Sequence, residues 1–437
     1  MTRYSRRPLA LAAVLALTTS PLTAQLDTAA GAQALAEFAA ACARDGGALW
    51  GRPLCGPLSL VDPATRAVIA NQPDSNHLLT ASGSVYVGPL PAGIVPSNTA
   101  VTWGGVHWAM VMLPLPADRF SRIELLAHES FHRIQAELGL SSPDASSPHL
   151  DERDGRVWLR LELHALAAAL SSGGSSARDA ARDALLFRAY RLSRYRGADS
   201  LEARLETQEG LAEYTGAKLA LAATGLSDQR LATELADYEG RPTYVRSFAY
   251  ATGPAIGLLL DRYAPDWRTR VRLRHDPAGL LAQALGFRAD DGLEREAKSA
   301  ARAYGAPAVM SAEDSRATER ATRLAAYRAR LVDGPVLVLK QRDLGFTMDP
   351  NTLVPLGDAG TVYPTGTFKA SWGTLQVSEG GALVSPDFTS VAVAAPADTA
   401  GQTLAGNGWK LELASGWVVR RSAGHAGSYE VVAAQQP

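Results

Sequence analysis

Residues 128–132 of the chain read His-Glu-Ser-Phe-His, an H-E-x-x-H pentapeptide, and no other pattern in the sequence constrains the chain as strongly. On an α-helix, positions i and i+4 lie on the same face, one turn apart. His128 and His132 would then direct two imidazoles toward one zinc ion, with Glu129 beside them as a general base. The pentapeptide therefore predicts a zinc site, provided that the segment is helical.

The flanking residues predict a helix from Ser121 to about Gly139. Ser121 and Glu124 have the spacing of a capping box, and Gly139 is a typical C-terminal stop. The alternative is a surface helix that carries two histidines by chance. An apolar face at helical spacing argues against it, because such a face is typical of a packed helix: Ile123, Leu126, Ala127, Phe131, Ile134 and Leu138.

A catalytic zinc site needs a third protein ligand, with the fourth position left for water. The metzincin arrangement would place Gly at position 135 and His at position 138. Gln135 and Leu138 stand there, which excludes that class.

Residues 209–214, Glu-Gly-Leu-Ala-Glu-Tyr, resemble the motif of the gluzincins, in which a Glu on a later helix completes the zinc site. The resemblance, to aminopeptidase N-like and thermolysin-like families, implies that Glu209 is the third ligand. It also implies that Glu213 supports a histidine ligand. Glu209 follows His132 by 77 residues, a wider spacing than in those families, and two helices at about 155–195 fill it. Glu162, on the first of these helices, is the alternative third ligand.

Residues 250–253, Tyr-Ala-Thr-Gly, precede an apolar run and resemble the Tyr-x-x-Gly segment of aminopeptidase N-like enzymes. In that group the tyrosine hydroxyl donates to the developing oxyanion, so the resemblance implies a catalytic Tyr250. Tyr244 is the second choice for this role. The alternative is a tyrosine that caps a core helix and satisfies its hydroxyl at the surface.

Residues 1–24 have the pattern of an export signal: a basic start, an apolar run over 8–17 and a small residue at the cleavage point. The sequence leaves open whether export is of the general or the twin-arginine type. Cys42 and Cys55 are the only cysteines. They predict a disulfide in an oxidising compartment, so we expect a periplasmic or extracellular protein.

The element pattern predicts an α+β fold in two domains. Residues 25–332 read as a zincin-like domain, with a small mixed sheet followed by a mainly helical part. Residues 333–437 change to short strand-like runs and predict an all-β accessory domain. A net charge of −1 favours neither nucleic acid nor an anionic membrane as a partner, and no segment after the signal is apolar enough to span a membrane.

The resemblance implies a secreted metallopeptidase that binds one Zn²⁺ and hydrolyses peptide or protein substrates. Water activated by the zinc would attack the peptide bond, with Glu129 as general base. The alternative is a catalytically inactive zinc-binding protein of the same fold, acting as a binding or structural module. The sequence does not distinguish endopeptidase from exopeptidase activity.

Overall fold

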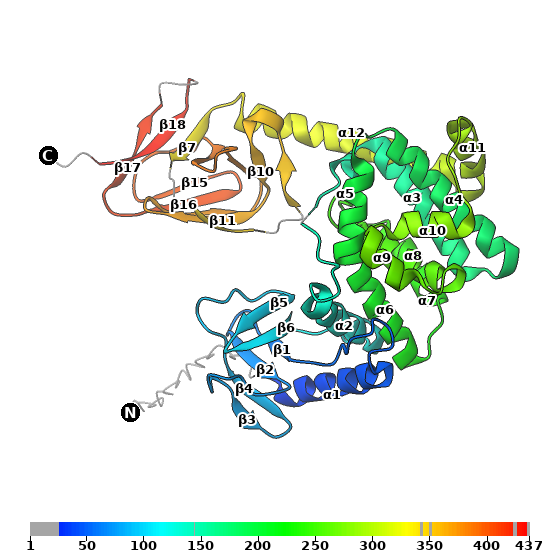
Figure 1. Cartoon of the computed structure of the whole chain (residues 1–437). Helices are drawn as coiled ribbons and strands as arrows, with labels where there is room; N and C mark the ends of the chain where they lie inside the picture. The colour runs from blue at the N-terminus through cyan, green and yellow to red at the C-terminus, as the bar shows by residue number, and fades with distance from the viewer. Residues whose placement is uncertain (1–25, 144, 341–343, 349–351, 423–425, 435–437) are drawn as a thin grey trace, which may run out of the picture. The chain divides into compact units, whose positions relative to one another are not determined.

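The computed structural model describes residues 26–143, 145–340, 344–348, 352–422 and 426–434 (Figure 1). Within these ranges the chain has an N-terminal sheet, a helical middle and C-terminal sheets, which confirms the predicted α+β class. Its internal contacts divide it into two compact units. One holds the residues up to Leu138 together with Thr215–Gly225, and the other holds Gly139–Tyr214 together with the residues from Leu226 onward. The predicted export signal, 1–24, lies outside the described residues.

A six-stranded sheet in the order β3-β4-β2-β1-β6-β5 forms the centre of the first unit. β1 and β6 are parallel and the other pairs are antiparallel, so the sheet is mixed as predicted. The middle of β6, residues 108–111, is completely buried, as expected for an apolar strand that is covered on both faces. The strand bounds are β1 Leu58–Val61, β2 Ala67–Ala70, β3 Thr80–Ser82, β4 Val85–Pro89, β5 Thr99–Trp103 and β6 Val106–Met112.

Two helices, α1 (Thr28–Asp45) and α2 (Arg119–Gln135), pack against each other and against this sheet. α1 was not predicted from the sequence, because its many alanines give only a weak apolar stripe. α2 was predicted, but with the wrong start. Asp118 is the N-cap, and its carboxylate accepts a hydrogen bond from the Ser121 backbone N–H at 2.9 Å. Ser121 therefore lies inside the first turn, and the predicted capping box does not form.

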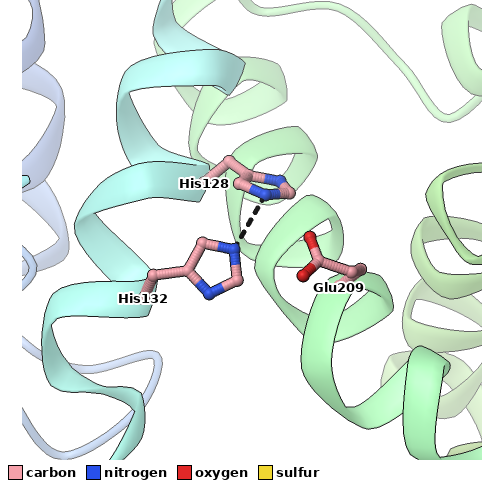
Figure 2. A group of neighbouring side chains, drawn as sticks. All are labelled: His128, His132 and Glu209. Carbon is pink, nitrogen blue, oxygen red and sulfur yellow. Dashed lines mark hydrogen bonds between the residues drawn. The ribbon is translucent and has the colours of Figure 1, made fainter. Parts of the chain in front are cut away.

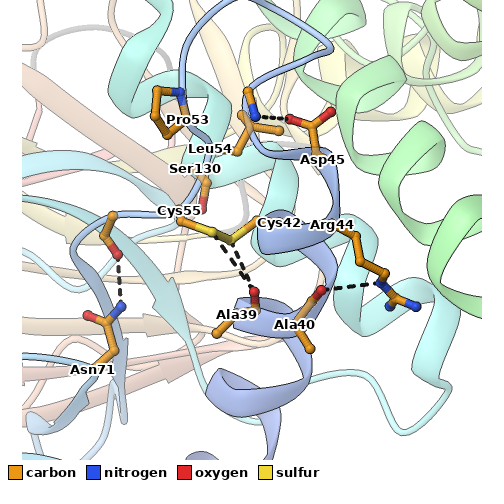
Figure 3. The surroundings of a disulfide bond; sticks show 12 residues. Ala39, Ala40, Cys42, Arg44, Asp45, Pro53, Leu54, Cys55, Asn71 and Ser130 are labelled. Carbon is orange, nitrogen blue, oxygen red and sulfur yellow. Dashed lines mark hydrogen bonds between the residues drawn. A yellow bond between two sulfur atoms is a disulfide. The ribbon is translucent and has the colours of Figure 1, made fainter.

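A disulfide joins Cys42 on α1 to Cys55 in the following loop, as predicted (Figure 3). The two Cα atoms are 5.5 Å apart. Close to this bridge, the Asn71 side chain holds the loop against the sheet by donating to the Gly56 carbonyl at 2.8 Å. The bridge ties the C-terminal end of α1 to the segment that enters β1.

The second unit contains most of the helices. α3 and α4 form an antiparallel hairpin, and α5 continues through a π-helical turn, η2 (the π segment), into α6. α9 was not predicted from the sequence. No helix in the described part of the chain combines the length and the apolar character needed to cross a membrane. The bounds are α3 Arg153–Ser171, α4 Gly174–Ser193, α5 Ala198–Leu205, η2 Glu206–Gly210, α6 Leu211–Thr224, α7 Gln229–Tyr238, α8 Ala249–Tyr263, α9 Trp267–Arg274, α10 Pro277–Leu285, α11 Leu293–Ala300 and α12 Ala306–Leu331, with short 3₁₀ turns at Pro148–Asp151 and Ala301–Tyr304.

The C-terminal part of this unit consists of two sheets, in the orders β17-β18-β7-β14-β13-β10-β9 and β15-β16-β12-β11-β8. One apolar core takes side chains from both sheets, so they pack face to face. The alternation of side chains along a strand explains this packing: in β16, buried and exposed residues alternate strictly, so that one face of the strand lies in the core. The bounds are β7 Val336–Lys340, β8 Gly345–Thr347, β9 Val354–Pro355, β10 Thr361–Tyr363, β11 Gly366–Ala370, β12 Gly373–Val377, β13 Ala382–Val384, β14 Ser390–Ala394, β15 Thr403–Gly406, β16 Trp409–Leu413, β17 Trp417–Arg421 and β18 Tyr429–Ala433.

Replacing both cysteines, Cys42→Ala with Cys55→Ala, should lower the free energy of unfolding by about 2–3 kcal/mol, because the bridge restricts a short loop of the unfolded chain. Urea unfolding followed by circular dichroism measures the change. Reducing agent should shift the wild-type curve by a similar amount and leave the double variant unchanged. Equal stability of the oxidised wild type and the double variant would contradict the prediction.

Candidate metal centre

Helix α2 contains the two predicted zinc ligands, His128 and His132, and the predicted general base, Glu129. Its apolar side packs on β5 and β6, and His128 and His132 lie one turn apart on another side. His128 and Glu129 are each 4 % exposed, whereas His132 is half-buried. Burial of polar side chains is costly unless they are paired, so their partners determine what the site does.

The part of α6 from Thr215 onward belongs to the same unit as α2 and runs antiparallel to it. Arg119, at the start of α2, donates to the carbonyl of Ala223 at 2.9 Å. Further along, the two backbones come so close that a Cβ on Gly216 would lie 2.5 Å from the Glu124 carbonyl oxygen. Only glycine fits at such a contact.

Helix geometry then relates Glu209 to the two histidines. Glu209 lies on the π segment that continues into α6, seven residues before Gly216. His128 and His132 follow Glu124 by four and eight residues on the antiparallel helix. At a rise of 1.5 Å per residue along the helix axis, Glu209 lies about 10 Å from Gly216. On α2, His128 and His132 lie about 6 and 12 Å from Glu124.

The side chains of His128, His132 and Glu209 form one group (Figure 2). Each offers a ligand atom, an imidazole nitrogen or a carboxylate oxygen, and these atoms lie within 4.8 Å of one another. The same donor set, two imidazoles and one carboxylate, is the one that three-ligand catalytic zinc sites use. The chemistry of the residues present therefore fits the predicted metal.

Hydrogen bonds orient the ring of His132. Its Nδ1 lies 2.7 Å from Oε1 of Gln135, and its Nε2 lies 3.0 Å from Nε2 of His128. An amide oxygen only accepts, so Nδ1 of His132 carries the proton and Nε2 presents its lone pair to the group. Gln135 is thus a partner of the site that sequence reasoning missed. Its position three residues after His132, on the same helix face, was the available signal.

Glu209 has a partner in its own unit, Tyr250 at the start of α8. The Tyr250 hydroxyl donates to Oε2 of Glu209 at 2.7 Å. Two glycines bring α8 this close to the π segment, because a Cβ on Gly253 would lie 2.3 Å from the Cα of Gly210. The glycines of the Glu209-Gly210 and Tyr250-x-x-Gly253 sequences therefore have a shared steric role. No local sequence pattern indicated that Glu209 would lie in a π-helical turn, a feature frequent at functional sites.

Glu162, the alternative third ligand, is occupied elsewhere. It is 1 % exposed and accepts hydrogen bonds from Arg188 Nε at 2.7 Å and Arg191 Nη1 at 2.5 Å. In the part of the chain that the structure describes, the group of potential metal ligands contains Glu209 and not Glu162. The geometry therefore favours Glu209.

The remaining site predictions differ in their outcome. Glu213 lies one turn after Glu209 and is half-buried, and its support of a histidine stays a prediction. Tyr244, the second choice for the oxyanion donor, is completely buried, with its hydroxyl bound to the Glu239 carbonyl at 2.8 Å. Its ring also lies under the Arg156 guanidinium, which suits a packing role.

Comparison of the chain with protein-family models, with curated proteins and with solved structures gives no match. The interpretation of the site therefore depends on its residues and their geometry.

The Gly253→Ala substitution should destabilise the chain by about 1–3 kcal/mol, because the new methyl group would overlap the backbone of Gly210. Urea unfolding measures the effect. Gly93→Ala is the matched control, since this exposed glycine lies outside any helix and its Cβ would meet nothing within 4 Å, and it should change stability by only a few tenths of a kcal/mol. Equal effects of the two substitutions would argue against the close helix contact.

Proposed function

We propose that this chain is a zinc-dependent metallopeptidase of the zincin class. The observation that carries the proposal is the group of His128, His132 and Glu209, with Glu129 next to the first of them on α2. Two imidazoles and one carboxylate suit zinc better than calcium or magnesium, which prefer oxygen ligands alone. When bound, zinc lowers the pKa of a coordinated water and polarises the substrate carbonyl.

The chain's own residues supply the proton transfers. Glu129 accepts a proton from the attacking water and passes it to the leaving amine, which splits the peptide bond without a free hydroxide ion. A nearly buried carboxylate is suited to this work, because burial removes competing bulk water. A purely structural metal site would have no use for it, which favours hydrolysis over an inactive binding protein.

Tyr250 is the proposed donor to the oxyanion of the tetrahedral intermediate. Its hydroxyl already donates at this group, to Glu209, and the residue is 36 % exposed. A donor that is held in place before the reaction stabilises developing charge at little cost of reorganisation. Gln135 keeps His132 in the tautomer that offers Nε2 to the metal.

We place the protein in the periplasm or outside the cell. The Cys42–Cys55 disulfide fits an oxidising compartment, and the signal pattern over 1–24 fits export. Its substrates would be peptides or proteins that are present there.

Glu129→Gln should leave zinc bound and abolish hydrolysis, because the amide keeps the size of the side chain but cannot accept the proton. Digestion of a broad peptide library, read by mass spectrometry with and without chelator, measures activity, and elemental analysis measures zinc. The control is Glu137→Gln, which changes an exposed carboxylate near the end of the same helix. Full activity of the Glu129→Gln enzyme would remove the mechanism. A zinc-loaded wild type that cleaves nothing in the library would favour the inactive binding protein.

Gln135→Met should weaken zinc binding by about 10–100-fold, since it removes the acceptor that orients His132. A competition titration against a chromophoric chelator gives the affinity. Gln229→Met, at an exposed position on α7, should leave it unchanged. Unaltered affinity in the Gln135→Met protein would show that the hydrogen bond does not support the site.

A further inference from the structure

Five charged side chains form a buried cluster in the second unit, between the α3–α4 hairpin and the helix that contains the π segment. All are at most 5 % exposed: Glu162 on α3, Arg188 and Arg191 on α4, Glu202 on α5 and Glu206 on the π segment. Buried charges persist only when partners compensate the loss of water.

Arg188 connects the hairpin directly to the π segment. Its Nη1 and Nη2 donate to the two carboxylate oxygens of Glu206, at 2.8 and 2.5 Å, while its Nε donates to Glu162 at 2.7 Å. Two parallel bonds from a planar guanidinium fix both the position and the orientation of a carboxylate. Burial raises the pKa of Glu206, and the charge of Arg188 opposes that shift.

Glu206 is also held from α8. The Thr252 hydroxyl donates to Oε1 of Glu206 at 2.6 Å. Thr252 follows Tyr250 by two residues, and Tyr250 bonds to Glu209. Glu206 and Glu209 are the first and fourth residues of the same five-residue π turn, so both ends of the turn are fixed by outside contacts.

A π turn departs from the regular helical bonding pattern and is rarely stable without such support. If the two parallel hydrogen bonds from Arg188 to Glu206 are lost, the turn can relax toward an ordinary helix. The direction of the Glu209 side chain changes with it, because side-chain directions follow the backbone.

We propose that Arg188 is a positioning residue for the third metal ligand: by clamping Glu206 it holds the π turn that directs Glu209 toward His128 and His132. The α3–α4 hairpin is then the support of the site and not a passive insertion. This inference rests on the proposed metallopeptidase function, because it concerns the same group of ligands.

Arg191 provides a matched comparison inside the same cluster. It is completely buried and donates to Glu162 at 2.5 Å and to Glu202 at 3.0 and 2.7 Å. The paired hydrogen bonds of the Arg191 guanidinium therefore go to α5, one turn before the π segment. In both Arg188→Lys and Arg191→Lys the charge stays, but lysine cannot make the two parallel bonds.

The test measures two properties of the full-length chain: zinc affinity by chelator competition, and amide hydrogen exchange of residues 206–210 in the metal-free protein. Arg188→Lys should weaken zinc binding by about 10-fold or more and speed exchange in the π turn. Arg191→Lys should stay within about 3-fold of the wild type in affinity, with unchanged exchange in these residues. Equal losses in both variants, or no loss in either, would overturn the assignment to Arg188.

The two proposals fail separately. If the wild type binds zinc but cleaves no peptide, the peptidase function fails, and the affinities still decide the role of Arg188. If the wild type binds no zinc, the metal site fails, and the exchange rates alone decide whether Arg188 holds the π turn. If Arg188→Lys does not fold, Thr252→Val removes a bond to Glu206 without removing a charge. Faster exchange at 206–210 in that variant would support the clamp, and unchanged exchange would contradict it.

Discussion

The close approach of α6 to α2 at Gly216 is the contact on which the candidate metal site depends. A side chain at this position would meet the backbone carbonyl of Glu124, so the two helices can lie this close only because residue 216 is glycine. α6 continues from the π segment, which means that the same contact limits where Glu209 can lie. The two imidazoles, one turn apart on α2, and the carboxylate of Glu209 form one group of potential metal ligands.

Hydrogen bonds from neighbouring side chains hold two of the three potential ligands, His132 and Glu209. Gln135 orients His132, and Tyr250 orients Glu209. Both partners are polar side chains on helices, whose backbones are fixed by packing. Such preorganisation matters because ligands that are already in place lose little conformational entropy when a cation binds.

The sequence predicted those features that depend on local patterns. The apolar spacing around the pentapeptide indicated α2, and the continuous apolar run indicated the buried strand β6. The prediction of Ser121 as N-cap was wrong: Asp118, three residues earlier, is also of a residue type that caps helices well, and its carboxylate accepts the bond from the free N–H of Ser121. α1 was missed because alanine-rich segments show little contrast between their faces.

The predictions that failed or stayed open depend on contacts between distant residues. Glu162 read as a rival ligand, since a sequence does not show that Arg188 and Arg191 engage it. The π turn at Glu206–Gly210 arises where α5 meets outside partners on α4 and α8, and no local pattern marks it. The resemblance of residues 209–214 to the gluzincin motif selected Glu209 correctly as a neighbour of the two histidines, although the spacing to His132 is long.

X-ray absorption spectroscopy of the zinc-loaded full-length protein tests the central claim most directly. The account predicts one zinc per chain, bound by two imidazoles and further oxygen ligands, and loss of one oxygen ligand or of the metal in Glu209→Ala. A spectrum with another number of imidazoles, or one that is unchanged when Glu209 is replaced, would contradict it.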